Sequence, residues 1–315
     1  MLLSSFFIIA GCALLFFGGD FLVRGAESIA IRHGISPLVV GLTVVAFGTS
    51  SPELFISVNA ALDGFDDVAI GNAVGSNICN LTLVLGIAAL LRPIKVEAQL
   101  MKLDAPILIF CSLILIWMLT DGVISRADGA ILTTGIVIYV FGSIYLSRRD
   151  KKLLDQEFEE TMHEDHPSTW NSLGLLILGL VMLGFGADFF VDGAVSIAQT
   201  LSIPEALISL TLIALGTSLP ELATTIVASI KGRGDIAVGN AIGSSIFNIL
   251  AILGVTSIIE PLSRGSIHWS DLWSMTLISI VLLPMLFTKN TLSRSEGGFL
   301  LAIYISYIGY LTTRM

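Results

Sequence analysis

The stretch GTSSPEL at residues 48–54 occurs a second time, with one substitution, as GTSLPEL at residues 216–222. The same offset of 168 residues, with no gap, also aligns GNAVGSNICN at 71–80 with GNAIGSSIFN at 239–248. Chance does not maintain one offset across two such motifs, so the chain contains an internal repeat that has to be recognised before any motif is interpreted. The repeat predicts two structurally equivalent halves.

The composition excludes several classes of protein. Of 315 residues, 54% are hydrophobic and 13% are charged, whereas soluble domains carry about 25% charged residues. The formal net charge is −9, which leaves no basic surface for a phosphate backbone. A soluble enzyme, a disordered protein and a nucleic-acid-binding protein are therefore excluded.

The apolar runs are long enough to cross a bilayer, which takes about 17 to 25 helical residues. They are uniformly apolar and lack the period-2 alternation of an outer-membrane barrel, so they predict an all-α polytopic membrane protein. We expect ten transmembrane helices, at 3–23, 35–60, 68–91, 103–120, 129–146, 171–191, 203–230, 236–259, 271–288 and 297–312.

The repeat and the loop charges together predict the topology. Each half holds five spans, an odd number, so the two five-helix repeats must enter the membrane with inverted topology. Thirteen of the sixteen Lys and Arg residues fall in the connections after the odd-numbered spans, which assigns those connections to the cytoplasm. Both termini are then expected on the non-cytoplasmic side of the cell (inner) membrane. Inverted repeats are typical of secondary transporters, whose ion sites lie near the bilayer midplane between the repeats.

The domain prediction follows the same division. Residues 1–147 form the first repeat, 148–170 a cytoplasmic charged linker and 171–315 the second repeat. We interpret the linker as a solvated connection because its charges occur in runs, and a regulatory site at His163 and His166 is the alternative.

Two carboxylates lie inside predicted spans. Glu53 and Glu221 have no Lys, Arg or His within a span to pair with. An acid at the centre of a membrane helix costs roughly 2.5 to 3.5 kcal/mol unless it is compensated. Protons or bound cations must therefore provide the compensation.

Other oxygen donors accompany each glutamate. Thr49 and Ser50 stand four and three residues before Glu53, and Thr217 and Ser218 stand likewise before Glu221, so we expect the hydroxyls and the carboxylate to lie on one face of each helix. Pro52 and Pro220 lack an N–H and are expected to free backbone carbonyls. On the following spans, four more side-chain oxygens recur at equivalent positions: Ser76, Asn80, Ser244 and Asn248.

These are hard oxygen ligands of the kind that calcium prefers, and two carboxylates neutralise one divalent cation. Sodium suits the same oxygen-rich cage. The residues alone leave Na⁺ and H⁺ open as the counter-ion.

At these motifs the chain resembles the cation/calcium exchanger superfamily, in particular its prokaryotic sodium/calcium exchanger branch. The paired G-T-S-x-P-E and G-N-x-x-G-S-x-x-x-N motifs look like the two alpha repeats of that family, and the resemblance covers essentially the whole chain. It implies antiport of Na⁺ against Ca²⁺, with no cofactor and with the two ions as substrates.

The resemblance also implies a ligand set. The calcium site would be formed mainly by Glu53, Glu221, Thr49 and Thr217. Sodium ligation would add the side chains of Ser50, Ser76, Ser218 and Ser244, the carbonyls of Ala46 and Ala214, and Asn80 and Asn248 at the centre. Many relatives, including potassium-dependent ones, carry Asp at one of the last two positions, so two Asn residues argue against potassium co-transport.

The resemblance further implies alternating access, in which spans 1 and 6 slide as a pair past the other eight. Both spans are Gly-rich and share Asp20/Asp188 and Gly25/Gly193 at equivalent positions. We interpret the two aspartates as structural groups near the interface, with an access route as the alternative.

The sequence thus predicts a sodium/calcium antiporter that exports Ca²⁺ as Na⁺ flows inward, embedded in a lipid bilayer and without an evident protein partner. The alternative is a proton/calcium exchanger of the same superfamily. An intramembrane hydrolase is a remote alternative, because Gly18-Gly19-Asp20 lacks the G-x-G-D spacing of aspartyl proteases and neither a Ser/His pair nor H-E-x-x-H is present. We therefore do not expect an enzyme.

Overall fold

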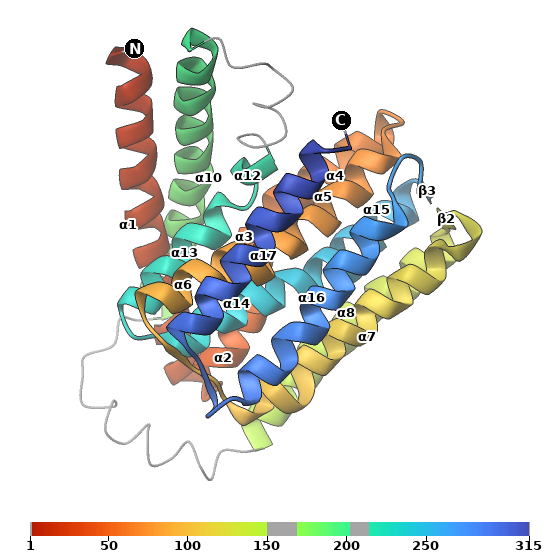
Figure 1. Cartoon of the computed structure of the whole chain (residues 1–315). Helices are drawn as coiled ribbons and strands as arrows, with labels where there is room; N and C mark the ends of the chain where they lie inside the picture. Colours follow the sequence, from red (N-terminus) through yellow and green to blue (C-terminus); the bar gives the residue numbers. More distant parts are fainter. Residues whose placement is uncertain (1, 150–168, 202–213, 315) are drawn as a thin grey trace.

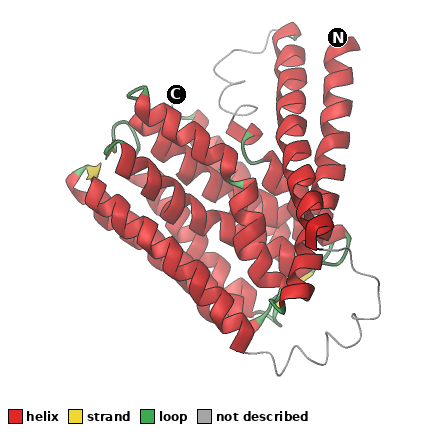
Figure 2. Ribbon diagram, turned by 180° about the vertical axis from the view of Figure 1, so that it is seen from behind, coloured by secondary structure: helices red, strands yellow, loops and turns green. Residues whose placement is uncertain are grey.

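The computed structural model describes residues 2–149, 169–201 and 214–314, and these are predominantly helical (Figures 1 and 2). The central part of the predicted linker, at 150–168, lies outside the described residues, as do residues 202–213 of the predicted seventh span. The all-α prediction is confirmed apart from four strands of two residues each.

The first half contains the following elements: α1 (Leu2–His33), α2 (Pro37–Val40), the π-helix η1 (Gly41–Val45), α3 (Ala46–Thr49), α4 (Ser51–Leu62), α5 (Asp66–Cys79), the π-helix η2 (Asn80–Val84), α6 (Leu85–Leu91), β1 (Ile94–Lys95), the π-helix η3 (Leu100–Asp104), α7 (Ala105–Met118), the 3₁₀ turn η4 (Leu119–Asp121), β2 (Val123–Ile124) and α8 (Arg126–Arg149).

The described part of the second half contains α10 (Thr169–Thr200), α12 (Ala214–Gly216), α13 (Leu219–Ile230), α14 (Gly234–Phe247), the π-helix η6 (Asn248–Leu253), α15 (Gly254–Ile259), β3 (Leu262–Ser263), α16 (Trp269–Phe287), β4 (Thr291–Leu292) and α17 (Arg294–Thr312). Most elements recur at the offset found in the sequence. For instance, α4, α5, β1 and β2 have their counterparts 168 residues later in α13, α14, β3 and β4.

The strands pair crosswise between the halves. β1 pairs antiparallel with β4, with Ile94 opposite Leu292, and β2 pairs antiparallel with β3, with Ile124 opposite Leu262. Since β3 is the counterpart of β1 and β4 is the counterpart of β2, each strand pairs with the strand of the other half that is not its own counterpart. Because α7 separates β1 from β2, the two strand pairs lie at opposite ends of the helices. An approximate twofold rotation that exchanges the two halves of the chain also exchanges these two ends. The same pairings join loops that the charge distribution assigns to the same side of the membrane.

The pair α1 and α10 stands beside the rest of the bundle (Figure 1). Glycines spaced seven residues apart allow the two backbones to touch: a Cβ on Gly18 would come within 2.9 Å of the Leu183 backbone nitrogen, and one on Gly179 within 2.7 Å of that of Leu22. Small residues on neighbouring helices permit such close packing in membranes. The other glycines of this contact are Gly11, Gly25, Gly186 and Gly193. The two helices therefore form one closely packed unit.

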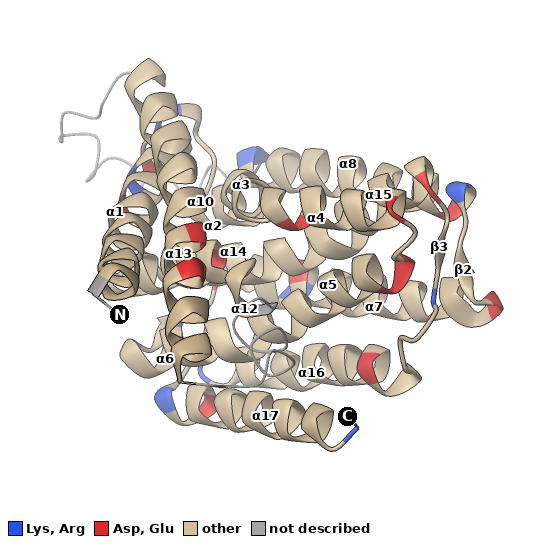
Figure 3. Ribbon diagram, turned by 90° about the horizontal axis from the view of Figure 1, so that it is seen from above, with Lys and Arg blue, Asp and Glu red and all other residues tan. Residues whose placement is uncertain are grey.

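Seven helices of the described residues are long and apolar enough to cross a membrane, or eight if the broken pair 37–49 and 51–62 is counted as one span. The predicted span at 297–312 corresponds to α17, and the span at 203–230 is described only from Ala214 onward. The count of ten thus remains a prediction. The helices α1 and α10, which correspond to predicted spans 1 and 6, run about ten residues beyond their predicted ends, to His33 and Thr200. Charged residues are sparse along the helices (Figure 3).

Candidate functional site

Both GTS-x-PE motifs break a helix at the same point. Ser50, between α3 and α4, has φ −86° and ψ 4°, and Ser218, between α12 and α13, has φ −90° and ψ 4°. This sparsely populated backbone region is common at turns and functional sites. Pro52 and Pro220 are the second residues of the helices that follow, where a missing N–H costs nothing. The chain bends by 45° at the first break.

Each break places a glutamate in the first turn of a helix, inside the protein. Glu53 and Glu221 are fully buried, and they belong to one polar cluster because Ser50, three residues before Glu53, hydrogen bonds to Glu221. Both carboxylate oxygens of Glu53 and Oε2 of Glu221 have no hydrogen-bond partner within the described residues. The ion pairs found among these residues all lie elsewhere. Two buried carboxylates without a basic partner among the residues described favour the binding of positive charge.

Hydrogen bonds between the halves assemble the site. The Ser50 hydroxyl donates to Oε1 of Glu221 at 3.0 Å, and the Thr49 hydroxyl donates to Oδ1 of Asn240 at 3.1 Å. The Thr49 hydroxyl also lies 3.4 Å from the Ser244 hydroxyl.

The expectation that Thr49 and Ser50 share one helical face with Glu53 is wrong. The helix breaks at Ser50, so these hydroxyls turn toward the opposite repeat instead.

The second repeat contributes Ser218, whose hydroxyl donates to that of Ser76 at 3.4 Å. Ala46 is the first residue of α3, and its carbonyl accepts from the backbone N–H of Ser50 at 3.0 Å and lies 3.3 Å from the hydroxyl oxygen of Thr49. Ala214 is the first residue of α12, and the role of its carbonyl remains a prediction.

The two central amides, Asn80 and Asn248, are fully buried. Each begins a π-helical segment, η2 or η6, within an otherwise continuous span. Such segments are frequent at functional sites because they redirect side chains without ending the helix. The amide group of Asn80 and the Oδ1 of Asn248 have no hydrogen-bond partner within the described residues.

Three amides that the sequence analysis did not select also support the site. Asn72 donates to the carbonyl of Glu53 at 3.2 Å, and Asn240 donates to that of Glu221 at 3.4 Å. Asn77 accepts a hydrogen bond from Asn248 at 3.0 Å. Asn72 and Asn240 are the equivalent second residues of the duplicated GN-x-x-GS motif, and this repetition was the available signal, whereas Asn77 directly follows the motif and has Ser245 as its counterpart.

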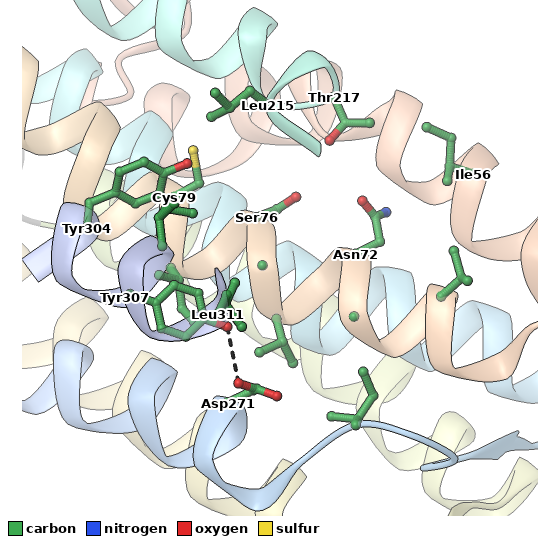
Figure 4. Close-up of a pocket in the computed structure, with 17 residues that line it drawn as sticks. Ile56, Asn72, Ser76, Cys79, Leu215, Thr217, Asp271, Tyr304, Tyr307 and Leu311 are labelled. Atoms are coloured by element: carbon green, nitrogen blue, oxygen red, sulfur yellow. Dashed lines mark hydrogen bonds between the residues drawn. The ribbon is translucent and has the colours of Figure 1, made fainter. Parts of the chain in front are cut away.

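A cavity of about 590 Å³ reaches the site (Figure 4). Its wall includes Thr217, Ser76 and Asn72, together with Tyr304 and Tyr307 of α17. Thr217, another predicted ligand, thus lies on its wall.

The donor chemistry favours hard cations. Among the residues that the structure describes, no group of three or more His, Cys, Asp and Glu side chains is arranged to hold a metal ion. The hydroxyl, amide and carboxylate oxygens of the candidate site are ligands of the kind that calcium and sodium prefer.

Asp20 and Asp188 differ in spite of their equivalent positions. Asp20 is buried and forms ion pairs with Arg24, at 2.9 Å, and with Lys231 of the turn after α13. Asp188 is exposed on α10. The pairing of Asp20 joins α1 to the second repeat, in agreement with the structural interpretation.

Comparison with known proteins identifies the class. The sodium/calcium exchanger protein family matches residues 3–145 and 171–313, and the chain belongs to this family. It is therefore a multi-pass membrane protein of the transporter class, within the prokaryotic branch of the cation/calcium exchangers.

Individual relatives cover almost the whole chain. It is 32% identical to the sodium/calcium exchanger MaX1 of Methanosarcina acetivorans over 96% of both chains. It is 36% identical to the inner membrane protein YrbG of Escherichia coli over 94% of this chain and 92% of YrbG. A solved structure of the sodium-calcium exchanger NCX_Mj, soaked without Na⁺ and Ca²⁺, matches with a TM-score of 0.85 and 34% identity, covering 98% of this chain and 99% of that one.

Proposed function

We propose that this protein exports Ca²⁺ from the cell in exchange for inward-moving Na⁺, using one cage between the two repeats that opens alternately to each side. Its cargo ligands are the glutamate, threonine, serine and asparagine side chains and the alanine carbonyls that the sequence predicts. Ca²⁺ is held mainly by Glu53, Glu221, Thr49 and Thr217.

The observation that carries the proposal is the pair of buried carboxylates from opposite repeats. Three of their four oxygens have no hydrogen-bond partner among the described residues. Sites of this kind are stable only with a cation or protons bound, because an unpaired buried charge is costly. Two negative charges match one Ca²⁺, and the neighbouring hydroxyls allow the same space to hold Na⁺ instead. Competition between the ions for one cage couples their movements.

The proposed topology has ten helices in two inverted repeats, with both termini outside the cytoplasm. The crosswise strand pairing at opposite ends of the helices supports inversion. We further propose the boundaries 1–147, 148–170 and 171–315, and the gap between the two family-matched segments is consistent with a central linker.

For alternating access we propose that α1 and α10 move together past the remaining helices. Their close contact at the glycines supports movement as one unit, and the helix breaks at Ser50 and Ser218 lie beside the proposed ion ligands. Transporters commonly use such discontinuous helices at the substrate site.

The proposal is tested with purified protein in sealed vesicles, with Na⁺, K⁺ and H⁺ gradients imposed separately. We expect Ca²⁺ uptake driven by an outward Na⁺ gradient that persists with a protonophore present. Uptake that follows the pH gradient and ignores Na⁺ would instead establish the proton/calcium exchanger alternative.

A further inference from the structure

Asn77 forms a polar contact between the repeats that the ligand set does not include. It lies on α5, fully buried, next to Ser76. Its Nδ2 donates to the backbone carbonyl of Ser245 at 3.1 Å and to the sulfur of Met275 at 3.4 Å, and its Oδ1 accepts from Nδ2 of Asn248 at 3.0 Å. The three groups form a relay that ends at the centre of the site.

The chemistry of the relay fixes its direction. A backbone carbonyl can only accept a hydrogen bond, so the NH₂ group of Asn77 must face Ser245. The oxygen of Asn77 then faces Asn248, which has to present its own NH₂ group. The Oδ1 of Asn248 is thereby left as the free end, buried and without a partner among the described residues. Oxygen is the atom of an amide that binds a cation.

The other repeat lacks this relay. The counterpart of Asn77 is Ser245, whose hydroxyl donates to the carbonyl of Ala241 in its own helix at 2.9 Å. Asn80, the counterpart of Asn248, has neither amide atom paired within the described residues. Within the described residues, one central amide is therefore oriented by a hydrogen bond and the other is not.

We propose that Asn77 is a positioning residue that holds the oxygen of Asn248 toward bound Na⁺ and so sets sodium affinity. The inference rests on the proposed function. Because the proposed calcium ligands do not include Asn248, loss of Asn77 affects Na⁺ more than Ca²⁺. Without the relay, the amide of Asn248 can turn its NH₂ group toward the cation, which repels it.

The test compares Asn77→Ser, the residue found in the other repeat, with wild type in the vesicle assay. The half-saturating Na⁺ concentration should rise roughly three- to tenfold, the range that one hydrogen bond is worth. The KM for Ca²⁺ should change less than twofold. Met275→Leu is the matched control, because it removes only the weak sulfur contact, and it should leave both constants unchanged.

A double-mutant cycle separates positioning from a general structural role. If Asn77 acts through Asn248, then Asn248→Ala and the double variant with Asn77→Ser should have equal sodium constants. The inference would be overturned if the effects of the two substitutions on the half-saturating Na⁺ concentration multiplied in the double variant. It would also be overturned if the constants for Na⁺ and Ca²⁺ changed by the same factor.

Asn77→Thr retains more side-chain volume and serves as a second variant in case the serine variant is poorly folded. It is scored by the same ratio of Na⁺ to Ca²⁺ constants, and an unchanged ratio contradicts the proposal. Wild-type protein without sodium-driven exchange would refute the proposed function itself, whereas normal wild-type exchange with an unaffected variant refutes only the role of Asn77.

Discussion

Replacing Glu53 with Gln removes a buried charge while preserving the shape of the side chain. Because neither carboxylate oxygen has a partner among the described residues, the charge contributes nothing to stability in the absence of a cation. We expect Glu53→Gln to be at least as stable as wild type in a calcium chelator without Na⁺. It should lose the stabilisation that Ca²⁺ gives, and calcium transport with it.

The size of the lost stabilisation follows from linkage. At a Ca²⁺ concentration one hundred times Kd, binding stabilises the wild type by about 2.7 kcal/mol. For a chain of this length, that free energy corresponds to an increase in Tm of about 4 °C. Thermal unfolding in detergent, with and without Ca²⁺, measures the increase.

The control is Glu260→Gln, which changes a half-exposed carboxylate at the end of α15 whose nearest basic group, on Arg126, is 3.8 Å away. This variant should retain the full calcium-induced increase in Tm. A Glu53→Gln protein that still gains stability from Ca²⁺ and still transports it would refute the assignment of the cage.

Three further predictions concern the supports of the site. Gly18→Ala would bring a methyl group within 2.9 and 3.0 Å of two backbone atoms of α10, so we expect thermal unfolding to show a loss of about 1 to 3 kcal/mol in stability. The control Gly184→Ala, whose methyl group would meet nothing within 4 Å, should be neutral, and equal effects of the two substitutions would contradict the close packing of α1 against α10. Asn240→Ala removes the hydrogen bonds of this amide with the hydroxyls of Thr49 and Thr225, at 3.1 and 3.0 Å, and with the carbonyl of Glu221, and it should raise the Kd for Ca²⁺ about tenfold. An unchanged Kd in calorimetry would show that these bonds do not shape the cage. Lys231→Met should lower the free energy of unfolding by about 1 kcal/mol because it removes one ion-pair partner of the buried Asp20. Adding Asp20→Asn to this variant should recover part of the lost stability, and no recovery would mean that loss of the ion pair does not cause the destabilisation.

Much of the fold could be predicted from the sequence because the repeated motifs contain residues, such as proline, that restrict the backbone conformation. Pro52 and Pro220 prevent a continuous helix at equivalent points, and the structure breaks both helices there. The offset of the GTS-x-PE motif is also the offset between α4 and α13. Apolar runs set the existence of the spans but not their ends, so α1 and α10 extend further than predicted.

The site was predicted less completely, and the reason is physical. Two acids without a basic partner in apolar runs predict the proposed cage, since burial makes an unpaired charge costly. The direction of a hydroxyl depends on backbone geometry at one residue, and the bridge conformation of Ser50 turned it toward Glu221 of the other half. The partnership of Asn77 with Asn248 joins residues 171 apart along the chain, and no periodicity within one helix predicts such a contact.

The central claim is that Ca²⁺ and Na⁺ compete for one cage formed by both repeats. Equilibrium binding of radioactive Ca²⁺ to the purified protein, with Na⁺ replacing choline at constant ionic strength, tests it most directly. We expect saturable Ca²⁺ binding that Na⁺ displaces and that either Glu53→Gln or Glu221→Gln abolishes. Calcium binding that survives both substitutions, or that does not respond to Na⁺, would contradict the account.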